Sequence, residues 1–139
     1  MQLSEFIKKS ESNSFNETFE LGNVSDAYAK DILNKTKVNI SGYKIVIDSL
    51  SIRHIFNNHG NKKKEEGRNQ IAVTAKDISL VPDIIHNFDV VVKSGTSGTG
   101  CETIKYIKQY SNKYYVVEEV RTRKKDIALK TMYIKKTLL

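Results

Sequence analysis

Residues 102–136 read ETIKYIKQYSNKYYVVEEVRTRKKDIALKTMYIKK, and this segment contains the clearest secondary-structure pattern of the chain. Three runs within it are rich in β-branched and aromatic residues: 102–110, 113–122 and 127–136. Such residues are typical of strands. The pair Ser111–Asn112 is short enough to join the first two runs in a tight hairpin. We therefore predict consecutive antiparallel strands, and the similar run DVVVKS (89–94) adds one more before them.

The first half of the chain reads as mainly helical. Apolar residues recur at helical spacing over four segments: 1–12, 26–36, 49–59 and 75–87. Ser25 and Thr74 are the expected N-caps of the second and fourth helices, and Pro82 should interrupt the fourth. A strand, YKIVIDS (43–49), precedes the third helix.

Two polar segments separate these elements. GNKKKEEGRNQ (60–70) is charged and rich in loop formers, and it reads as a solvated loop. SGTSGTG (94–100) reads as a flexible link. It is not a phosphate-binding loop, because it lacks the Lys-Ser/Thr ending of such loops and a strand follows it.

Together these patterns predict an α+β fold. In it, N-terminal helices pack on one face of a roughly four-stranded antiparallel sheet. The length of 139 residues fits one domain, and the 39% of hydrophobic residues suffices for a core. Because the connections after residue 88 are short, we expect a meander.

The charge of the chain favours polyanionic partners. The formal net charge is +7, and such a surplus attracts nucleic acid, an acidic protein or an anionic membrane surface. The alternative is a protein that is basic without a functional reason. Cys101 is the only cysteine, which excludes a disulfide framework and a cysteine-based zinc site. The start MQLSEFIKKS has no long apolar run, so neither a signal peptide nor a membrane span is predicted.

Two histidines, His54 and His59, lie in IRHIFNNHG (52–60) on the predicted third helix. Around a regular helix these positions are about 140° apart, so they share a face only if the chain leaves the helix at His59, before Gly60. A place at the helix C-terminus favours the imidazolium form of His59, which suits a general acid or a phosphate ligand. His54 lies between isoleucines and is either a core residue or a second site residue.

Thr131 and Tyr133 are two residues apart on the last predicted strand, so their side chains should point to the same side. A hydroxyl and a phenol placed side by side can hold a phosphate oxygen or orient a nucleophile. The alternative is a buried row, because Ile127 and Leu129 share their alternation.

Cations surround these strands. Arg121 and Arg123 precede the last strand, and an arginine can bind a phosphate through two hydrogen bonds. Lys105 and Lys113 alternate with tyrosines in the hairpin, a pattern that suits an RNA backbone and stacked bases. Solvated charged surfaces are the alternative for both groups. No acid or histidine cluster has metal-ligand spacing, so we expect neither a metal nor a cofactor.

In order and spacing, several segments resemble those of the phage-associated barnase–EndoU–colicin–RelE-like (BECR) ribonucleases. The segments are ELGNVS (20–25), the strand ending in IDS (47–49), IRHIFNNHG (52–60), TAKDISLVPDII (74–85), the hairpin around 102–120 and TMYIKK (131–136). The resemblance covers roughly residues 20–137. It implies a helix-first fold with a four-stranded antiparallel sheet, and it divides the chain into an N-terminal helix and loop (1–19) and a nuclease domain (20–139).

The resemblance also implies metal-independent RNA cleavage, frequently as a toxin of phages or mobile elements. By position it assigns catalytic roles to these residues: His59, His54, Thr131, Tyr133 and Arg121. Lys105 is the other candidate for the basic catalytic residue. We expect RNA to bind through Lys105, Lys113 and Arg123.

The leading prediction is therefore an endoribonuclease that cleaves RNA by attack of the ribose 2′-hydroxyl. We expect it in the cytoplasm, or delivered to a target cell's cytoplasm as part of a phage or toxin protein. RNA and an acidic immunity or antitoxin protein are the expected partners, and no membrane is expected. Two alternatives remain: a non-catalytic RNA- or protein-binding module on the same scaffold, or another nucleotide-processing enzyme such as an ADP-ribosyltransferase.

Overall fold

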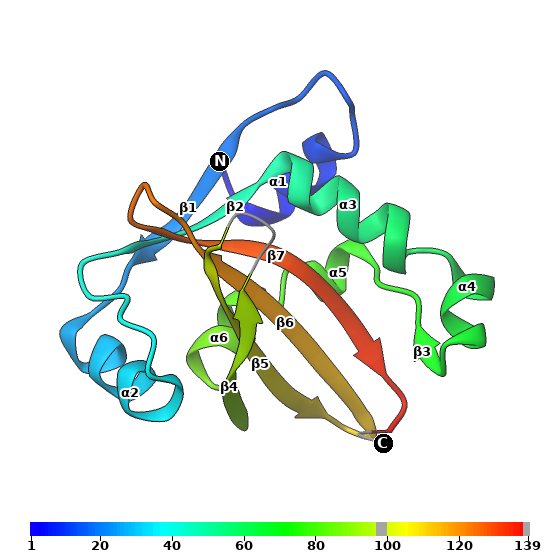
Figure 1. Cartoon of the computed structure of the whole chain (residues 1–139). Helices are drawn as coiled ribbons and strands as arrows, with labels where there is room; N and C mark the ends of the chain where they lie inside the picture. Colours follow the sequence, from blue (N-terminus) through cyan, green and yellow to red (C-terminus); the bar gives the residue numbers. More distant parts are fainter. Residues whose placement is uncertain (97–99, 138–139) are drawn as a thin grey trace.

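The computed structural model describes residues 1–96 and 100–137 and shows an α+β fold (Figure 1). The helices are α1 (Leu3–Ser10), α2 (Asp26–Thr36), α3 (Ser49–His59), α4 (Lys62–Gly67), α5 (Ala75–Ile78) and α6 (Val81–His86). The strands are β1 (Thr18–Asn23), β2 (Lys44–Asp48), β3 (Gln70–Ile71), β4 (Val90–Thr96), β5 (Glu102–Tyr110), β6 (Lys113–Arg121) and β7 (Asp126–Lys135). In this part of the chain, no helix is both long and apolar enough to cross a membrane.

Within the described residues the strands form a seven-stranded mixed sheet in the order β1-β2-β7-β6-β5-β4, with β3 paired to β7. The strands β4 to β7 are consecutive antiparallel neighbours, as the sequence predicts. The predicted four-stranded antiparallel sheet is nevertheless too small, because β1, β2 and β3 extend it and β2 runs parallel to β7. This parallel pair joins Val46 to Ala128, and local sequence patterns do not predict a contact between residues so far apart in the sequence.

Local signals set the helix boundaries where the sequence contains them. The Ser25 hydroxyl accepts a hydrogen bond from the Tyr28 backbone N–H at 3.1 Å, and Thr74 forms a capping box with Asp77. Pro82 divides the predicted fourth helix into α5 and α6. Proline is tolerated only in the first turn of a helix, where its missing N–H has no partner to lose.

Two predicted connections have more structure than expected. Segment 60–70 is not a solvated loop, because it forms α4, whose N-cap Asn61 accepts a hydrogen bond from the Lys64 backbone N–H at 3.1 Å. Glu65 on this short helix is fully buried. In the predicted link 94–100, the first residues complete β4, and residues 97–99 lie outside the described residues.

The core lies between the helices and one face of the sheet. It contains isoleucines from four helices together with inward-facing strand residues: Ile32, Ile52, Ile55, Ile78, Ile84, Tyr106, Val117 and Met132. Fully burying a side chain of this size contributes about 1.5–3 kcal/mol. The opposite face of β4–β7, here called the open face, has no helix over it in Figure 1, and its residues Val90 and Val92 are 48% and 42% exposed.

A β-bulge at Lys130 decides which side chains of β7 reach the open face. Glu118 of β6 pairs with Thr131, whereas the next residue, Glu119, pairs with Leu129. Lys130 is therefore an extra residue on β7, and an extra residue shifts the alternation of side chains by one position.

The shift separates two sets of side chains. Leu129 before the bulge and Met132 and Ile134 after it are all in the core. Thr131 and Tyr133 consequently face the other side and are half-buried. The two residues point to the same side, as predicted, but they do not continue the buried row of Leu129.

A carboxyl group in the core, that of Glu119, ends a chain of hydroxyl groups. Glu119 is 1% exposed, and its Oε2 has no hydrogen-bond partner among the described residues. Burial raises the pKa of Glu119 to about 8. The Tyr106 hydroxyl hydrogen-bonds Glu119 and lies 3.2 Å from the Tyr28 hydroxyl, which donates to the Ile85 carbonyl at 2.7 Å. With Glu119 protonated, each hydroxyl in this chain donates once.

This arrangement predicts a pH-dependent stability. Glu119 binds its proton more tightly in the fold than in the unfolded chain, so its contribution is full below about pH 4.5 and falls as the pH rises toward 8. Glu119→Gln keeps a neutral donor at every pH. We expect the Tm of this variant to exceed that of the wild type at about pH 8, with a difference that shrinks toward pH 5. A difference in Tm that does not vary with pH would show that Glu119 is ionised in the fold.

Candidate active site

The C-terminal end of α3 places His59 beside β7. His59 is the last residue of the helix, and its carbonyl accepts a hydrogen bond from the Val73 backbone N–H at 2.7 Å. Gly60 follows, and a side chain would not fit there, because a Cβ atom would lie 2.4 Å from the Phe56 carbonyl oxygen. The glycine therefore lets the chain leave α3 directly after the histidine.

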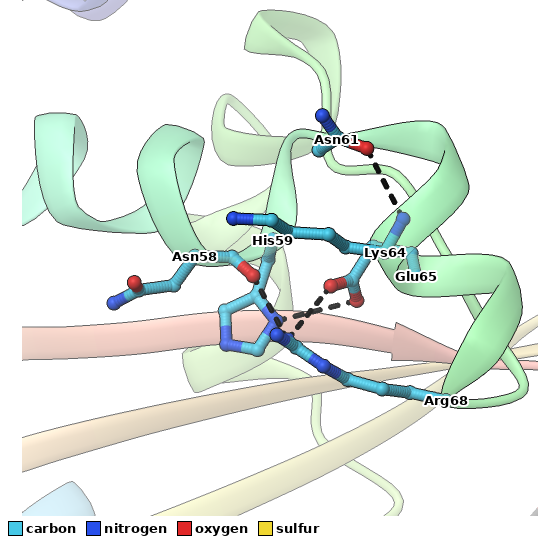
Figure 2. A network of polar contacts seen from close by, with 6 residues as sticks. All are labelled: Asn58, His59, Asn61, Lys64, Glu65 and Arg68. Carbon is cyan, nitrogen blue, oxygen red and sulfur yellow. Dashed lines mark hydrogen bonds and ion pairs between the residues drawn. The ribbon is translucent and has the colours of Figure 1, made fainter.

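Buried Glu65 links His59 to Arg68, as Figure 2 shows. Oε2 of Glu65 lies 3.3 Å from Nδ1 of His59, and its Oε1 lies 2.9 Å from Nη1 of Arg68. The same Nη1 donates to the Asn58 carbonyl at 2.9 Å. A carboxylate removed from water needs such partners, because an unpaired buried charge costs several kcal/mol. The network thus ties α4 to the end of α3.

The contact with Glu65 fixes the orientation of the imidazole. A neutral histidine carries one N–H, and an ionised carboxylate only accepts hydrogen bonds, so the proton is drawn to Nδ1 of His59. Nε2 is then the nitrogen that can exchange a proton with another molecule. The side chain of His59 keeps 16% of its surface exposed, as a proton-transfer group requires.

On its other side, His59 contacts Tyr133 of β7. The ring centroids are 5.5 Å apart, and the ring planes are inclined by 34°. Tyr133 belongs to the open face, where the strand register continues from it into an apolar row: Val116, Ile107 and Val90. His59 therefore stands at the end of this row.

A second row on the open face carries polar groups. Thr131 lies opposite Glu118, and Glu118 lies opposite Lys105. Side chains directly opposite each other have Cβ atoms about 5 Å apart, and Tyr133 is the diagonal neighbour of Glu118, at about 7–8 Å. A hydroxyl, a carboxylate, an amine and a phenol can therefore approach the same small group of a substrate.

Four of the predicted site residues meet on the open face or at its edge: His59, Thr131, Tyr133 and Lys105. Arg121 lies apart from them. Arg121 is three residues after Glu118 on β6, so its side chain points to the face opposite the open face. There its Nε donates to the Tyr43 hydroxyl at 2.8 Å, and its guanidinium pairs with Glu102. Its position on β6 is five residues from the partner of Tyr133, or roughly 16 Å along the strand.

Lys113 and Arg123, both predicted to bind RNA, lie at the two ends of β6. Lys113 begins the strand, Arg123 lies two residues beyond its last residue, and both are exposed. They therefore lie near opposite ends of β6.

His54 is exposed on α3, so the interpretation of this residue as part of the core is wrong. The helix includes both His54 and His59, so the two side chains project about 140° apart. The chain leaves the helix only at Gly60, after His59, so the two side chains are not brought to the same face.

The groups around His59 are suited to moving protons and holding an anion. They offer an oriented imidazole, a carboxylate, two hydroxyl groups and an ammonium group. Within residues 1–96 and 100–137, no three His, Cys, Asp or Glu side chains are placed to hold a metal ion.

Three residues of this arrangement were not predicted from the sequence: Glu65, Arg68 and Glu118. Glu65 and Arg68 lie in the charged segment that reads as a loop. A signal for α4 was present, however, because Asn61 is a favourable N-cap and Glu65 follows it by one helical turn. Glu118 is one of two adjacent glutamates, and alternation assigns one of them to each face.

Comparison with protein families supports a nuclease. Residues 22–138 match the family described as phage-Barnase-EndoU-ColicinE5/D-RelE like nuclease3. The match spans most of the chain, so the chain belongs to this family, and the resemblance noted in the sequence is confirmed. Comparisons with curated proteins and with solved structures find no match.

The network around Glu65 predicts different effects for two adjacent glutamates. Glu65→Gln removes the charge that holds His59 and Arg68, and we expect a loss of about 1–3 kcal/mol in the free energy of unfolding. Glu66→Gln changes the exposed neighbour and should stay within about 0.5 kcal/mol of the wild type. Urea unfolding measures both. Equal effects of the two substitutions would contradict a structural role for the Glu65 carboxylate.

Proposed function

We propose that this member of the phage-Barnase-EndoU-ColicinE5/D-RelE like nuclease3 family is a metal-independent endoribonuclease that uses the ribose 2′-hydroxyl as its nucleophile. The observation that carries the proposal is the placement of His59 between buried Glu65 and Tyr133, beside the polar row of the open face. An imidazole with one nitrogen held by a carboxylate has its other nitrogen available for proton transfer.

His59 is the general acid in this proposal. As an imidazolium it keeps its Nδ1–H on Glu65 and donates the Nε2–H to the 5′ oxygen as the P–O5′ bond breaks. Glu65 holds Nδ1 of the imidazole, and the position of His59 at the end of α3 places the ring beside Tyr133. Glu65 is a positioning residue, because it acts on the substrate only through His59.

Glu118 is the general base in this proposal. It is the carboxylate of the polar row, and it lies opposite Thr131 and diagonal to Tyr133. Its side chain takes the proton of the 2′-hydroxyl as O2′ forms a bond to phosphorus. The products are a 2′,3′-cyclic phosphate and a 5′-hydroxyl, so all atoms and protons are accounted for without a further reactant.

The remaining groups of the row stabilise the charge of the transition state. Lys105 lies opposite Glu118, from where its ammonium can approach the nonbridging oxygens of the phosphate. The hydroxyl groups of Thr131 and Tyr133 can donate hydrogen bonds to the same oxygens.

The net charge of +7 supports a second part of the proposal, an acidic inhibitor protein. A cell that makes an active ribonuclease needs to block it, and opposite charge speeds association. The alternative function, an RNA- or protein-binding module, shares the fold but requires neither the orientation of His59 nor the carboxylate of Glu118.

The reaction is tested by incubating labelled RNA with the pure protein and EDTA. We expect cleavage that leaves a 2′,3′-cyclic phosphate, and no cleavage of DNA of the same sequence, because DNA lacks the nucleophile. Dependence on a divalent cation, or equal cutting of DNA, would overturn the mechanism. Binding of RNA without any cleavage would favour the binding module.

The assignment of roles is tested by three variants. His59→Ala and Glu118→Gln should each lower the rate by roughly two to four orders of magnitude, the usual range for a proton-transfer group. His54→Ala changes the exposed histidine of the same helix and should have little effect. A large loss of rate in His54→Ala, with His59→Ala close to wild type, would reverse the roles of the two histidines.

A further inference from the structure

A group of cations lies beside His59, at the end of the sheet where β3 pairs with β7. Its members come from α4 and from the ends of β6 and β7, and we call the group the basic rim: Lys62, Lys63, Lys64, Lys113, Lys135 and Lys136. All of them are exposed except Lys135, which is half-buried. Of these six lysines, Lys113 alone is among the residues through which the sequence predicted RNA binding.

The rim adjoins the candidate active site directly. Lys62 follows His59 by three residues, so their Cα atoms are no more than about 11 Å apart. Lys135 follows Tyr133 by two residues on β7 and therefore shares its face, where it lies opposite Tyr114. Figure 2 shows the Lys64 side chain directed from α4 back toward the end of α3.

The charge of the rim is not cancelled within α4. Glu65 is fully buried and is occupied by His59 and Arg68, which leaves Glu66 as the exposed carboxylate beside three lysines. Charges separated by less than about 8 Å act together at physiological ionic strength. The three lysines and the one exposed carboxylate of α4 therefore leave a net positive charge in the part of the rim next to the imidazole.

We propose that the basic rim binds the phosphates of RNA nucleotides that flank the cleavage site, so that the substrate is a single strand several nucleotides long. The inference rests on the proposed ribonuclease function and extends it from one phosphate to a path along the protein. The strand runs from the polar row of the open face, past Tyr133 and His59, to α4.

The composition of the rim favours a polyanion over a docked protein. Protein interfaces depend on buried apolar anchors surrounded by a polar border. Among the described residues, the exposed large apolar side chains are Met1, Leu33, Leu50, Val90 and Val92, and none belongs to the rim. Flexible lysines without an apolar centre are instead typical of sequence-independent binding to a nucleic-acid backbone.

The test compares two triple variants of the full chain. Lys62→Gln/Lys63→Gln/Lys64→Gln removes the charges of α4, and glutamine preserves helix propensity. The matched control, Lys30→Gln/Lys35→Gln/Lys37→Gln, removes the same charge from the region of α2, at the other end of the molecule in Figure 1. Both are made with and without His59→Ala, so that binding can be measured without cleavage.

Binding to single-stranded RNA of about ten nucleotides is measured as a function of salt. If the three α4 lysines neutralise phosphates, the slope of log K against log salt should become shallower by about 2 in the rim variant. Between about 50 and 200 mM salt the wild type should then lose roughly 15- to 20-fold more affinity than the variant. The control variant should keep the wild-type slope.

Cleavage gives a second readout. The rim variant should show a raised KM on the same RNA but a rate close to wild type on a dinucleoside monophosphate, which has no flanking phosphate. An unchanged salt slope with intact cleavage would overturn the proposal. So would a rim variant that loses affinity only for an acidic polypeptide such as polyglutamate. If the wild type cleaves no RNA, the proposed function fails, and the salt slopes still decide whether the rim binds RNA.

Discussion

The arrangement of the candidate site depends on one extra residue in β7, the bulge at Lys130. Before the bulge Leu129 belongs to the core, and after it Met132 and Ile134 do, so the strand remains buried on one side along its whole length. The bulge thereby turns Thr131 and Tyr133 to the open face. Without it, an unbroken alternation would place these two polar side chains in the core at a cost of several kcal/mol. The bulge therefore keeps the core side of β7 apolar while its two polar side chains lie on the open face.

The second constraint is the buried carboxylate of Glu65. It needs partners, and it finds them in His59 at the end of α3 and in Arg68 just after α4. The interaction that makes α4 part of the fold is thus the same one that orients the imidazole. Because α4 also carries Lys62, Lys63 and Lys64, the short helix connects the stability of the domain, the proposed proton-transfer group and the positive surface beside it.

Much of this fold was predictable because local signals specify it. The caps Ser25 and Thr74 define helix starts, and β-branched runs define β4 to β7. The candidate site was only partly predictable. His59, Thr131 and Tyr133 were identified by their residue types. Glu65 was not, because it lies in a charged segment and its burial depends on His59, a partner from another helix. The parallel pairing of β2 with β7 and the bulge at Lys130 depend on contacts between residues far apart in the sequence, and such contacts produce no periodic pattern of apolar residues.

The proposed donation of a proton from His59 to the leaving oxygen can be tested by changing the leaving atom. In an RNA with sulfur in place of the bridging 5′ oxygen at the cleavage site, a thiolate can leave without protonation, because thiols are far more acidic than alcohols. We expect His59→Ala to cleave ordinary RNA very slowly but to cleave the sulfur-containing RNA at close to the wild-type rate. An equally large loss of rate on both substrates would contradict it.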